Sequence, residues 1–507
     1  MISSSKIYHD YRKFIYYSEK ALLKKNIEHS LRFLSSASSL AYHYNLLYND
    51  DSLELLVDKI TNEISSLILK PVIEDKIIFY DSFGLDNKGL THQYISAIAS
   101  TGKPFLYILN SENNSDCDLI INQLSKHRNA EIIIVEKNLN YISKINFINK
   151  VISDYNPSYS FMQMTPWDVV GVVCWTINSK IKRFQINLTD HSFWLGKNCF
   201  DFIIEFRGYG AALTSKLRNI PIHKIHILHY YPIINSLPFS GFPCNTEGKT
   251  VIFSGGAYFK IYGENDVYFK ILKRILNENQ NILIFFAGSG DKRPFEQFIK
   301  KNNFQTKIYL LGTRLDINAV IAKSDIFLST FPINGGLMCQ LAVTNGKIPI
   351  VYSDTKFPFN FINLFFKDSL KYNLDFFDLN LFHNELNRII NDKKYRLEIQ
   401  KNLKYIIPTI EEFNSDFSKL LYLSKSNLSE NYKFINFNND IFSFHKLLLD
   451  IENNYIKSYF IVKLNKIYNF YYQYNFLDFL ISSFQLLYMN YTVVLKKLFF
   501  YARTQKK

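Results

Sequence analysis

Apolar and polar positions between residues 251 and 354 alternate in blocks that have the lengths of strands and helices. The apolar runs VIFSGG, NILIFFAG and KIYLLGT are interleaved with a helical pattern over residues 266–279. The runs SDIFLST and IPIVYSD close the region, with a glycine-bounded helical segment between them. Strands alternating with helices of roughly ten to fifteen residues form βαβ units with parallel strands. We therefore predict an α/β doubly wound sheet here.

A second set of such units precedes this region. The segment DKIIFYDSFGLDNKGLTHQYISAIASTGKPFLYIL has the order strand, glycine-containing loop, helix and strand. AEIIIVEK is a further strand and INFINKVISDYNP a further helix. The connector YYPIINSLPFSGFPCNTEGKT contains prolines and glycines and has no helical period, which indicates a domain boundary. The prediction is a Rossmann-like domain over residues 73–235 and a second over residues 250–370, with ligands at the carboxyl ends of their strands.

The remaining segments show helical periodicity. Residues 1–72 carry an apolar stripe that one turn interrupts. This pattern is typical either of one tetratricopeptide-like hairpin or of a helical cap on the next domain. Residues 371–430 contain an amphipathic, charged pattern that predicts closing helices. Residues 431–507 are expected to form an aromatic, basic helical tail.

Composition narrows the class of protein. A chain of 507 residues with 47% hydrophobic content can bury several cores and is not disordered. The five cysteines have no paired spacing, which favours a reducing compartment over a disulfide framework or a zinc site. The first residues lack a basic-then-apolar signal sequence, and no run of about 18 apolar residues predicts a spanning helix. We therefore expect a cytoplasmic protein.

The formal charge of +14 is partly concentrated at the C-terminal end. Residues 455–507 contain eight Lys or Arg, one Asp and sixteen aromatic residues. Aromatic rings and cations together suit an anionic bilayer surface, so peripheral attachment to the inner face of a cell membrane is expected. Nucleic acid is the competing partner for such charge, but the sequence contains no recognised nucleic-acid-binding motif.

The segment TDHSFWLG holds the candidate catalytic residues. It follows the predicted strand KRFQINL, at a position where doubly wound domains carry functional groups. His191 has the chemistry to accept a proton from a hydroxyl near neutral pH, and Asp190 can orient the imidazole or contact a sugar. The structural alternative is that His191 caps a following helix and Trp194 belongs to the core.

Candidate ligand-binding residues lie at the strand ends of the second domain. In SGGAYFKIYG, Gly255 and Gly256 permit a close approach of backbone to a diphosphate, and Lys260 supplies a cation. In NGGLMCQLAVTNGKIP, the double glycine opens a helix whose N-terminal amides can bind an anion. These two glycines are Gly335 and Gly336. The remaining strand-end candidates are Gly288 and Arg314; for Arg314 the alternative is a pair with a surface carboxylate.

The histidines in HKIHILH (His223, His226 and His229) are the best metal candidates in the chain. On a strand, His226 would point away from the other two, and no acidic residue is adjacent. We therefore predict no metal site. The Asp in PWDVV (Asp168) is either a cleft residue or the acid that starts a helix, and the helix start is favoured.

The order of these motifs resembles that of GT-B glycosyltransferases, and within them bacterial relatives of the O-GlcNAc-transferase-like family. The resemblance covers roughly residues 15–410. It rests on the helical hairpin, on YFKI after a glycine turn, and on SDIFLSTFPINGG followed by NGKIPIV. DHSFWLG is similar to a DHxFWxG segment of bacterial sugar transferases, which favours a functional role for His191.

The resemblance implies roles for several residues. Lys260 matches the lysine that contacts the donor diphosphate, and Asn334 with the following double glycine matches a phosphate-binding helix start. At the position of the family's ribose-binding acid this chain has Leu341, next to Gln340. The paired glutamates of many retaining relatives are missing, which favours inversion of configuration. Inverting enzymes with this fold generally need no metal, so no cofactor is expected besides the nucleotide-sugar substrate, with UDP as its nucleotide.

The expected fold is thus GT-B, with two Rossmann-like domains facing a cleft, an N-terminal helical hairpin and a C-terminal helical tail. The expected activity is transfer of a hexose or N-acetylhexosamine to a glycan or lipid-linked acceptor in envelope polysaccharide synthesis, such as that of lipopolysaccharide. Two alternatives remain. One is a protein O- or N-glycosyltransferase, and the other is a non-catalytic scaffold with a degenerate transferase fold. The missing ribose acid favours the scaffold, while the glycines and Lys260 favour an enzyme.

Overall fold

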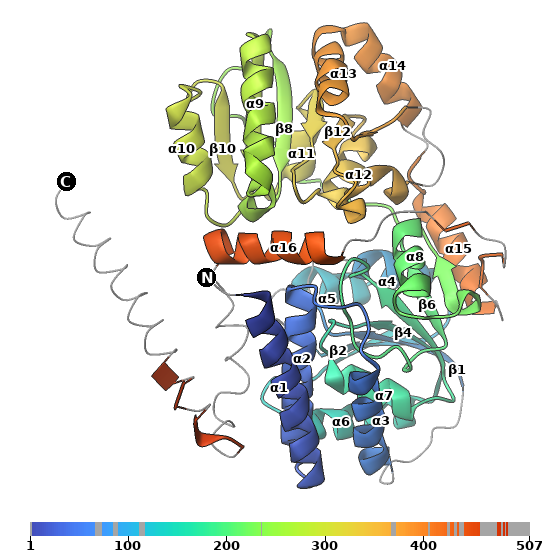
Figure 1. Ribbon diagram of the computed structural model, residues 1–507. Coiled ribbons are helices and arrows are strands. Elements are labelled where there is room, and N and C mark those ends of the chain that lie inside the picture. Colours follow the sequence, from blue (N-terminus) through green and yellow to red (C-terminus); the bar gives the residue numbers. More distant parts are fainter. Residues whose placement is uncertain are drawn as a thin grey trace, which may run out of the picture.

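Two parallel β-sheets, one above the other in Figure 1, form the centres of the two halves of the computed structural model. The first sheet has seven strands and the second has six. This confirms the predicted α/β architecture of two doubly wound domains. The structure describes residues 3–65, 74–84, 90–110, 117–234, 236–366, 372–403, 406–422, 426–429, 433–434, 441–456, 474–477, 480–481 and 483–484.

The first sheet has the strand order β3-β2-β1-β4-β5-β6-β7. Its strands are β1 (Glu74–Asp81), β2 (Phe105–Leu109), β3 (Ala130–Ile134), β4 (Pro157–Gln163), β5 (Lys182–Asn187), β6 (Phe202–Glu205) and β7 (Ile225–Ile227). The helices between them are α4 (Thr91–Ser100), α5 (Asp118–Leu124), α6 (Tyr141–Tyr155), α7 (Val169–Ile177) and α8 (Gly208–Lys216).

Strand β4 pairs with both β1 and β5 at the centre of this sheet, yet the apolar pattern does not reveal it. Its sequence PSYSFMQ begins with proline and contains serine and glutamine, of which Ser160 and Gln163 are completely buried. The surrounding strands bury these polar side chains, so the polar positions do not mark solvent. The prediction for Asp168 is confirmed, because its carboxylate accepts a hydrogen bond from the Gly171 amide and caps α7.

The second sheet has the strand order β10-β9-β8-β11-β12-β13 and contains every strand that the pattern predicts. Its strands are β8 (Thr250–Gly255), β9 (Ile282–Ala287), β10 (Ile308–Gly312), β11 (Ile326–Leu328), β12 (Ile348–Tyr352) and β13 (Asp375–Phe376). The helices are α9 (Val267–Glu278), α10 (Arg293–Lys301), α11 (Ile317–Ala322) and α12 (Gly336–Thr344), and a 3-10 turn, η3 (Tyr258–Ile261), follows β8. Gly346 ends α12 with a φ of 67°, as its place before β12 predicts.

Three helices form the N-terminal cap: α1 (Ser4–Leu23), α2 (Ile27–His43) and α3 (Asp51–Ser65). The predicted hairpin is α1 with α2. Small residues allow close packing there, since Ser18 and Ser30 each donate a hydroxyl hydrogen bond to the other's carbonyl, at 2.7 and 2.9 Å. Both helices share a core with α6 and α7, so the cap packs on the first domain.

The C-terminal helices contact both domains. Helices α13 (Leu379–Asn391) and α14 (Lys393–Leu403) pack on the second domain, while α15 (Ile410–Tyr422) returns to α4 of the first, where Phe413 meets Tyr94. Helix α16 (Ile441–Ile451) lies between the two halves (Figure 1). The predicted tail beyond residue 456 falls almost wholly outside the described residues. Among the helices that the structure describes, none is long and apolar enough to cross a bilayer.

Candidate active site

The TDHSFWLG segment forms a loop at the carboxyl end of β5, on the side of the first sheet that faces the second domain. No helix begins between this loop and β6, so His191 does not cap one. Trp194 is buried against Phe200, as the structural alternative expects for that residue. The His191 side chain retains 35% exposure and is therefore accessible to a ligand.

Asp190 is completely buried and is held by Arg207. The Arg207 guanidinium donates to both carboxylate oxygens, at 2.5 and 2.9 Å. Burial alone would raise the pKa of Asp190, but Arg207 and His191 outweigh it and hold this pKa below its usual range. The His191 Nδ1 atom lies 3.5 Å from the carboxylate. Asp190 is thus placed to orient the imidazole and is too buried to reach a sugar.

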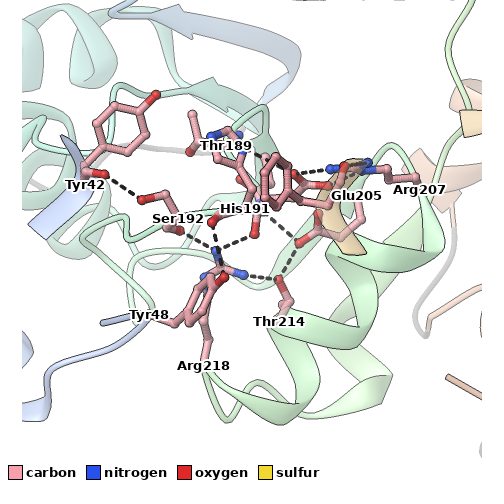
Figure 2. Close-up of polar contacts among 12 residues, drawn as sticks. Tyr42, Tyr48, Thr189, His191, Ser192, Glu205, Arg207, Thr214 and Arg218 are labelled. Atoms are coloured by element: carbon pink, nitrogen blue, oxygen red, sulfur yellow. Dashed lines mark hydrogen bonds and ion pairs between the residues drawn. The ribbon is translucent and has the colours of Figure 1, made fainter. Parts of the chain in front are cut away.

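The N-terminal cap supports the same loop from the other side (Figure 2). The Tyr48 hydroxyl donates to the carbonyl of His191 at 3.2 Å, and the Ser192 hydroxyl donates to the carbonyl of Tyr42 at 2.7 Å. Arg218 donates to the carbonyls of Asp190 and Ser192, on either side of the histidine. The backbone around His191 is therefore fixed by several independent contacts.

The imidazole of His191 faces residues from outside the first domain. Its ring centroid lies 6.3 Å from that of Phe359 and 6.2 Å from that of Phe444 on α16. The carbonyl of Phe359 also accepts a hydrogen bond from Arg207 at 2.7 Å. His191 therefore lies where the two domains and α16 meet.

The predicted glycines of the second domain come together at the carboxyl ends of β8 and β9. A Cβ atom on Gly288 would lie 2.0 Å from the carbonyl oxygen of Gly256, so only glycine permits this approach of the two loops. Gly255 faces the carbonyl of Ala287 and the side chain of Met338 on α12. The loops after β8 and β9 and the start of α12 thus form one surface.

Lys260 lies beside this surface, with its stem against Gly256. Burial lowers the pKa of its ammonium, and Cys339 in the first turns of α12 acts in the opposite direction. Within the part of the chain that the structure describes, the ammonium has no carboxylate and no hydrogen-bond acceptor. A largely buried cation without a counter-charge is costly, and a bound anion would remove that cost.

Helix α12 begins at Gly336 with no side chain capping its first amides. A Cβ atom on Gly336 would lie 2.4 Å from the ring of Phe365, so glycine is required there. Asn334 donates its backbone amide to the Asn360 side chain at 2.9 Å and its side-chain amide to the Asn360 carbonyl at 2.8 Å. Gln340 is buried and donates to the carbonyl of Phe365 at 3.2 Å. These two residues anchor the segment 358–366 over the start of α12.

Arg314 is another predicted ligand-binding residue whose side chain is engaged within the chain. Its guanidinium forms two hydrogen bonds of 2.6 Å with Asp316 and one of 3.0 Å with the carbonyl of Gly241 in the connector. Arg314 therefore has a carboxylate partner, the alternative that the sequence left open. The described residues hold no group of His, Cys, Asp or Glu arranged to bind a metal.

Comparison of the sequence with protein-family models and with curated proteins finds no match. Solved structures are similar in fold. An O-GlcNAc transferase of Thermobaculum terrenum matches with a TM-score of 0.52 and 11% identity, over 86% of this chain and 81% of that one. HepE of Anabaena, solved with UDP and glucose, matches with a TM-score of 0.52 and 12% identity, over 69% and 99%. A Rickettsia africae glycosyltransferase gives 0.50 and 12%, over 69% and 100%.

The chain has the GT-B fold. At these identities the likeness establishes the fold alone. In this GT-B chain, the carboxyl ends of both sheets carry the candidate residues: the His191 loop on the first domain, and the glycines with Lys260 on the second.

Sequence reasoning missed several residues that support the His191 loop. Glu205 is the last residue of the strand run FIIE and Arg207 lies two residues beyond it, and charged residues at a strand end were a signal that could have drawn attention to them. Arg218 and Phe359 gave no such signal, because they reach the His191 loop through contacts between segments far apart in the sequence.

Proposed function

We propose that this chain is a nucleotide-sugar-dependent glycosyltransferase. The observation that carries the proposal is the unpaired Lys260 ammonium beside the uncapped start of α12. A diphosphate fits this site, since helix N-terminal amides and a cation both favour negative charge. The glycosyltransferases among the structural neighbours support the proposal, and HepE was solved with UDP, which makes UDP the first nucleotide to test.

In the proposed reaction the two domains have different roles. His191 accepts the proton of an acceptor hydroxyl as the hydroxyl oxygen attacks the anomeric carbon of the donor sugar. The bond from that carbon to the diphosphate breaks, and the leaving charge is stabilised by Lys260 and the amides of α12. A single displacement of this kind inverts the anomeric configuration. No metal is needed in this scheme, because Lys260 and the amides supply the positive charge.

Nucleotide binding tests the donor half of the proposal. We expect UDP or a UDP-sugar to raise the melting temperature of the purified chain above that given by GDP and CMP and their sugar conjugates. A ligand at 100 times its Kd stabilises a folded protein by about 2.7 kcal/mol, which is easily seen in a thermal-shift assay. A flat screen at millimolar concentrations would contradict the proposal and favour the non-catalytic scaffold.

For the acceptor we propose a glycan, free or lipid-linked, in envelope polysaccharide synthesis. The support is the aromatic and basic composition of residues 455–507, which would bring a cytoplasmic enzyme to an anionic bilayer where such acceptors are held. The sugar nucleotide that gives the largest thermal shift is used in radioactive form. We expect its label to enter the lipid or polysaccharide fraction of a cell extract. Label that enters only the protein fraction would instead identify a protein glycosyltransferase.

A further inference from the structure

Glu205 is a buried carboxylate at the end of β6, directly beneath the His191 loop (Figure 2). Its Oε1 atom accepts hydrogen bonds from the Asn187 side-chain amide at 2.9 Å and from the Thr214 hydroxyl at 2.5 Å. Its Oε2 atom is buried and has no hydrogen-bond partner among the described residues. One oxygen therefore makes all of the hydrogen bonds of this side chain.

The first of these bonds leads to the start of the His191 loop. Asn187 donates its side-chain amide to Glu205, and its side-chain oxygen accepts a hydrogen bond from the backbone amide of Thr189 at 3.1 Å. Glu205 thus orients the Asn187 side chain, and this side chain in turn fixes the backbone at the start of the His191 loop.

The second bond leads to both sides of His191. The Thr214 hydroxyl donates to Glu205, which leaves its oxygen free to accept a hydrogen bond from Arg218 at 3.1 Å. The other end of the Arg218 guanidinium donates to the carbonyls of Asp190 at 2.9 Å and Ser192 at 2.5 Å. Both chains of contacts from Oε1 therefore end on the loop that carries the proposed base.

Several charged or titratable groups face Glu205 from the elements packed around it. Burial raises the pKa of Glu205 to about 7, Arg218 opposes this rise, and Asp190 adds to it. Tyr94 on α4 is also close enough to interact with the carboxylate. On α8, a Cβ atom at Gly210 would lie 2.2 Å from Oε2, so glycine is what allows the helix to approach. Glu205 therefore exchanges its proton in the pH range in which a histidine base operates.

We propose that Glu205 is a positioning residue for His191, and that its ionisation tightens the loop by strengthening the hydrogen bonds from Asn187 and Thr214. An ionised oxygen accepts hydrogen bonds more strongly than a neutral carboxyl does. Loss of the proton from Glu205 thus draws Asn187 and the Thr214–Arg218 pair toward Oε1, and both hold the loop. The inference rests on the proposed function for the role of His191, but the contacts themselves do not depend on it.

The first experiment needs no activity. Infrared difference spectra of the unliganded protein between acid and neutral pH are expected to show buried carboxylic acids with midpoints near pH 7, one of which is missing in Glu205→Gln. Glu54 is the matched control, since burial raises its pKa to about 7 as well, and it accepts hydrogen bonds from Gly196 and Lys197 beyond the histidine. A band lost only in Glu54→Gln would overturn the inference.

The second experiment follows transfer from UDP-sugar to water or acceptor as the pH changes. We expect the wild-type kcat to fall below pH 7, and Glu205→Gln to weaken this pH dependence and to lose about tenfold in kcat at pH 8, with the donor KM unchanged. An unaltered pH profile and rate in Glu205→Gln would overturn the proposal.

Two further variants keep the test decisive if Glu205→Gln does not fold. Thr214→Val removes the hydroxyl between Glu205 and Arg218, whereas Thr214→Ser keeps it, so only the serine variant should retain the wild-type pH profile. Equal behaviour of the two would contradict the positioning role. If the infrared result holds while no sugar nucleotide is turned over by any variant, then the proposed glycosyltransferase function fails and the Glu205 protonation equilibrium stands.

Discussion

Replacing Lys260 with methionine should weaken UDP binding by about 100-fold and also stabilise the unliganded protein. The loss of affinity corresponds to about 2.7 kcal/mol, within the range for truncating one partner of a desolvated charge pair. The gain in stability follows because the described residues offer the ammonium no counter-charge, so methionine fills the same space without that cost. Titration calorimetry with UDP and thermal unfolding without it measure the two effects.

The stabilisation of Lys260→Met relative to the wild type should also depend on pH, and its direction follows from the pKa of Lys260. Burial lowers the pKa of Lys260 below 10.5, so the folded chain releases this proton at a lower pH than the unfolded chain does. The wild-type protein is therefore penalised while Lys260 is charged and gains relative stability as the pH rises toward 10.5. The advantage of Lys260→Met should shrink over the same range.

Lys273→Met is the matched control for this substitution. Lys273 lies on α9 in the same domain and is exposed, so its replacement should change neither UDP affinity nor stability appreciably. An unchanged UDP affinity in Lys260→Met would refute the placement of the donor diphosphate. A loss of stability in the same variant would show that the ammonium has a partner in solution.

Replacing His191 with alanine should reduce kcat for sugar transfer by about 10²- to 10⁴-fold, the usual contribution of a general base. UDP affinity should remain near the wild-type value, because His191 belongs to the first domain whereas Lys260 and the start of α12 belong to the second. Steady-state kinetics and UDP titration on the same preparation separate the two quantities.

His223→Ala provides the control for this second prediction. His223 is exposed and lies just before β7, and no contact with the His191 loop is seen among the described residues. Its replacement by alanine should therefore leave kcat unchanged. If His191→Ala retained more than about a tenth of the wild-type kcat, the imidazole would not be the base. Another group would then have to accept the proton of the acceptor.

Apolar runs were enough to predict most of the fold. The strands β8, β9, β11 and β12 are nearly continuous apolar runs, as expected for parallel strands buried on both faces, and the edge strand β10 is apolar but only partly buried. The pattern failed at β4, where Ser160 and Gln163 are buried inside the sheet. Helix α3 was predicted as part of the helical N-terminal region, and one short loop separates it from α2.

The site was predictable only where a motif lies on one continuous segment. Lys260 and the double glycines stand directly after strands, and the structure brings Gly256, Gly288 and Lys260 together. The partners of His191 come from segments that only the folded chain brings near it, including Arg218 and Phe444. Arg314 is different, because its carboxylate partner is only two residues away in the sequence. The hydrophobic periodicity gave no reason to prefer that carboxylate over a phosphate as the partner of Arg314.

Helix α16 joins all three parts of the molecule. His445 contacts the carbonyl of Tyr44 and the hydroxyl of Ser4 in the cap, while Leu447 packs near Gly263 in the second domain. The chain crosses back to the first domain beside α15, on the opposite side of Figure 1. Separation of the two domains is thus restrained covalently on one side and by α16 on the other. Loss of α16 would therefore leave the two domains restrained on one side alone.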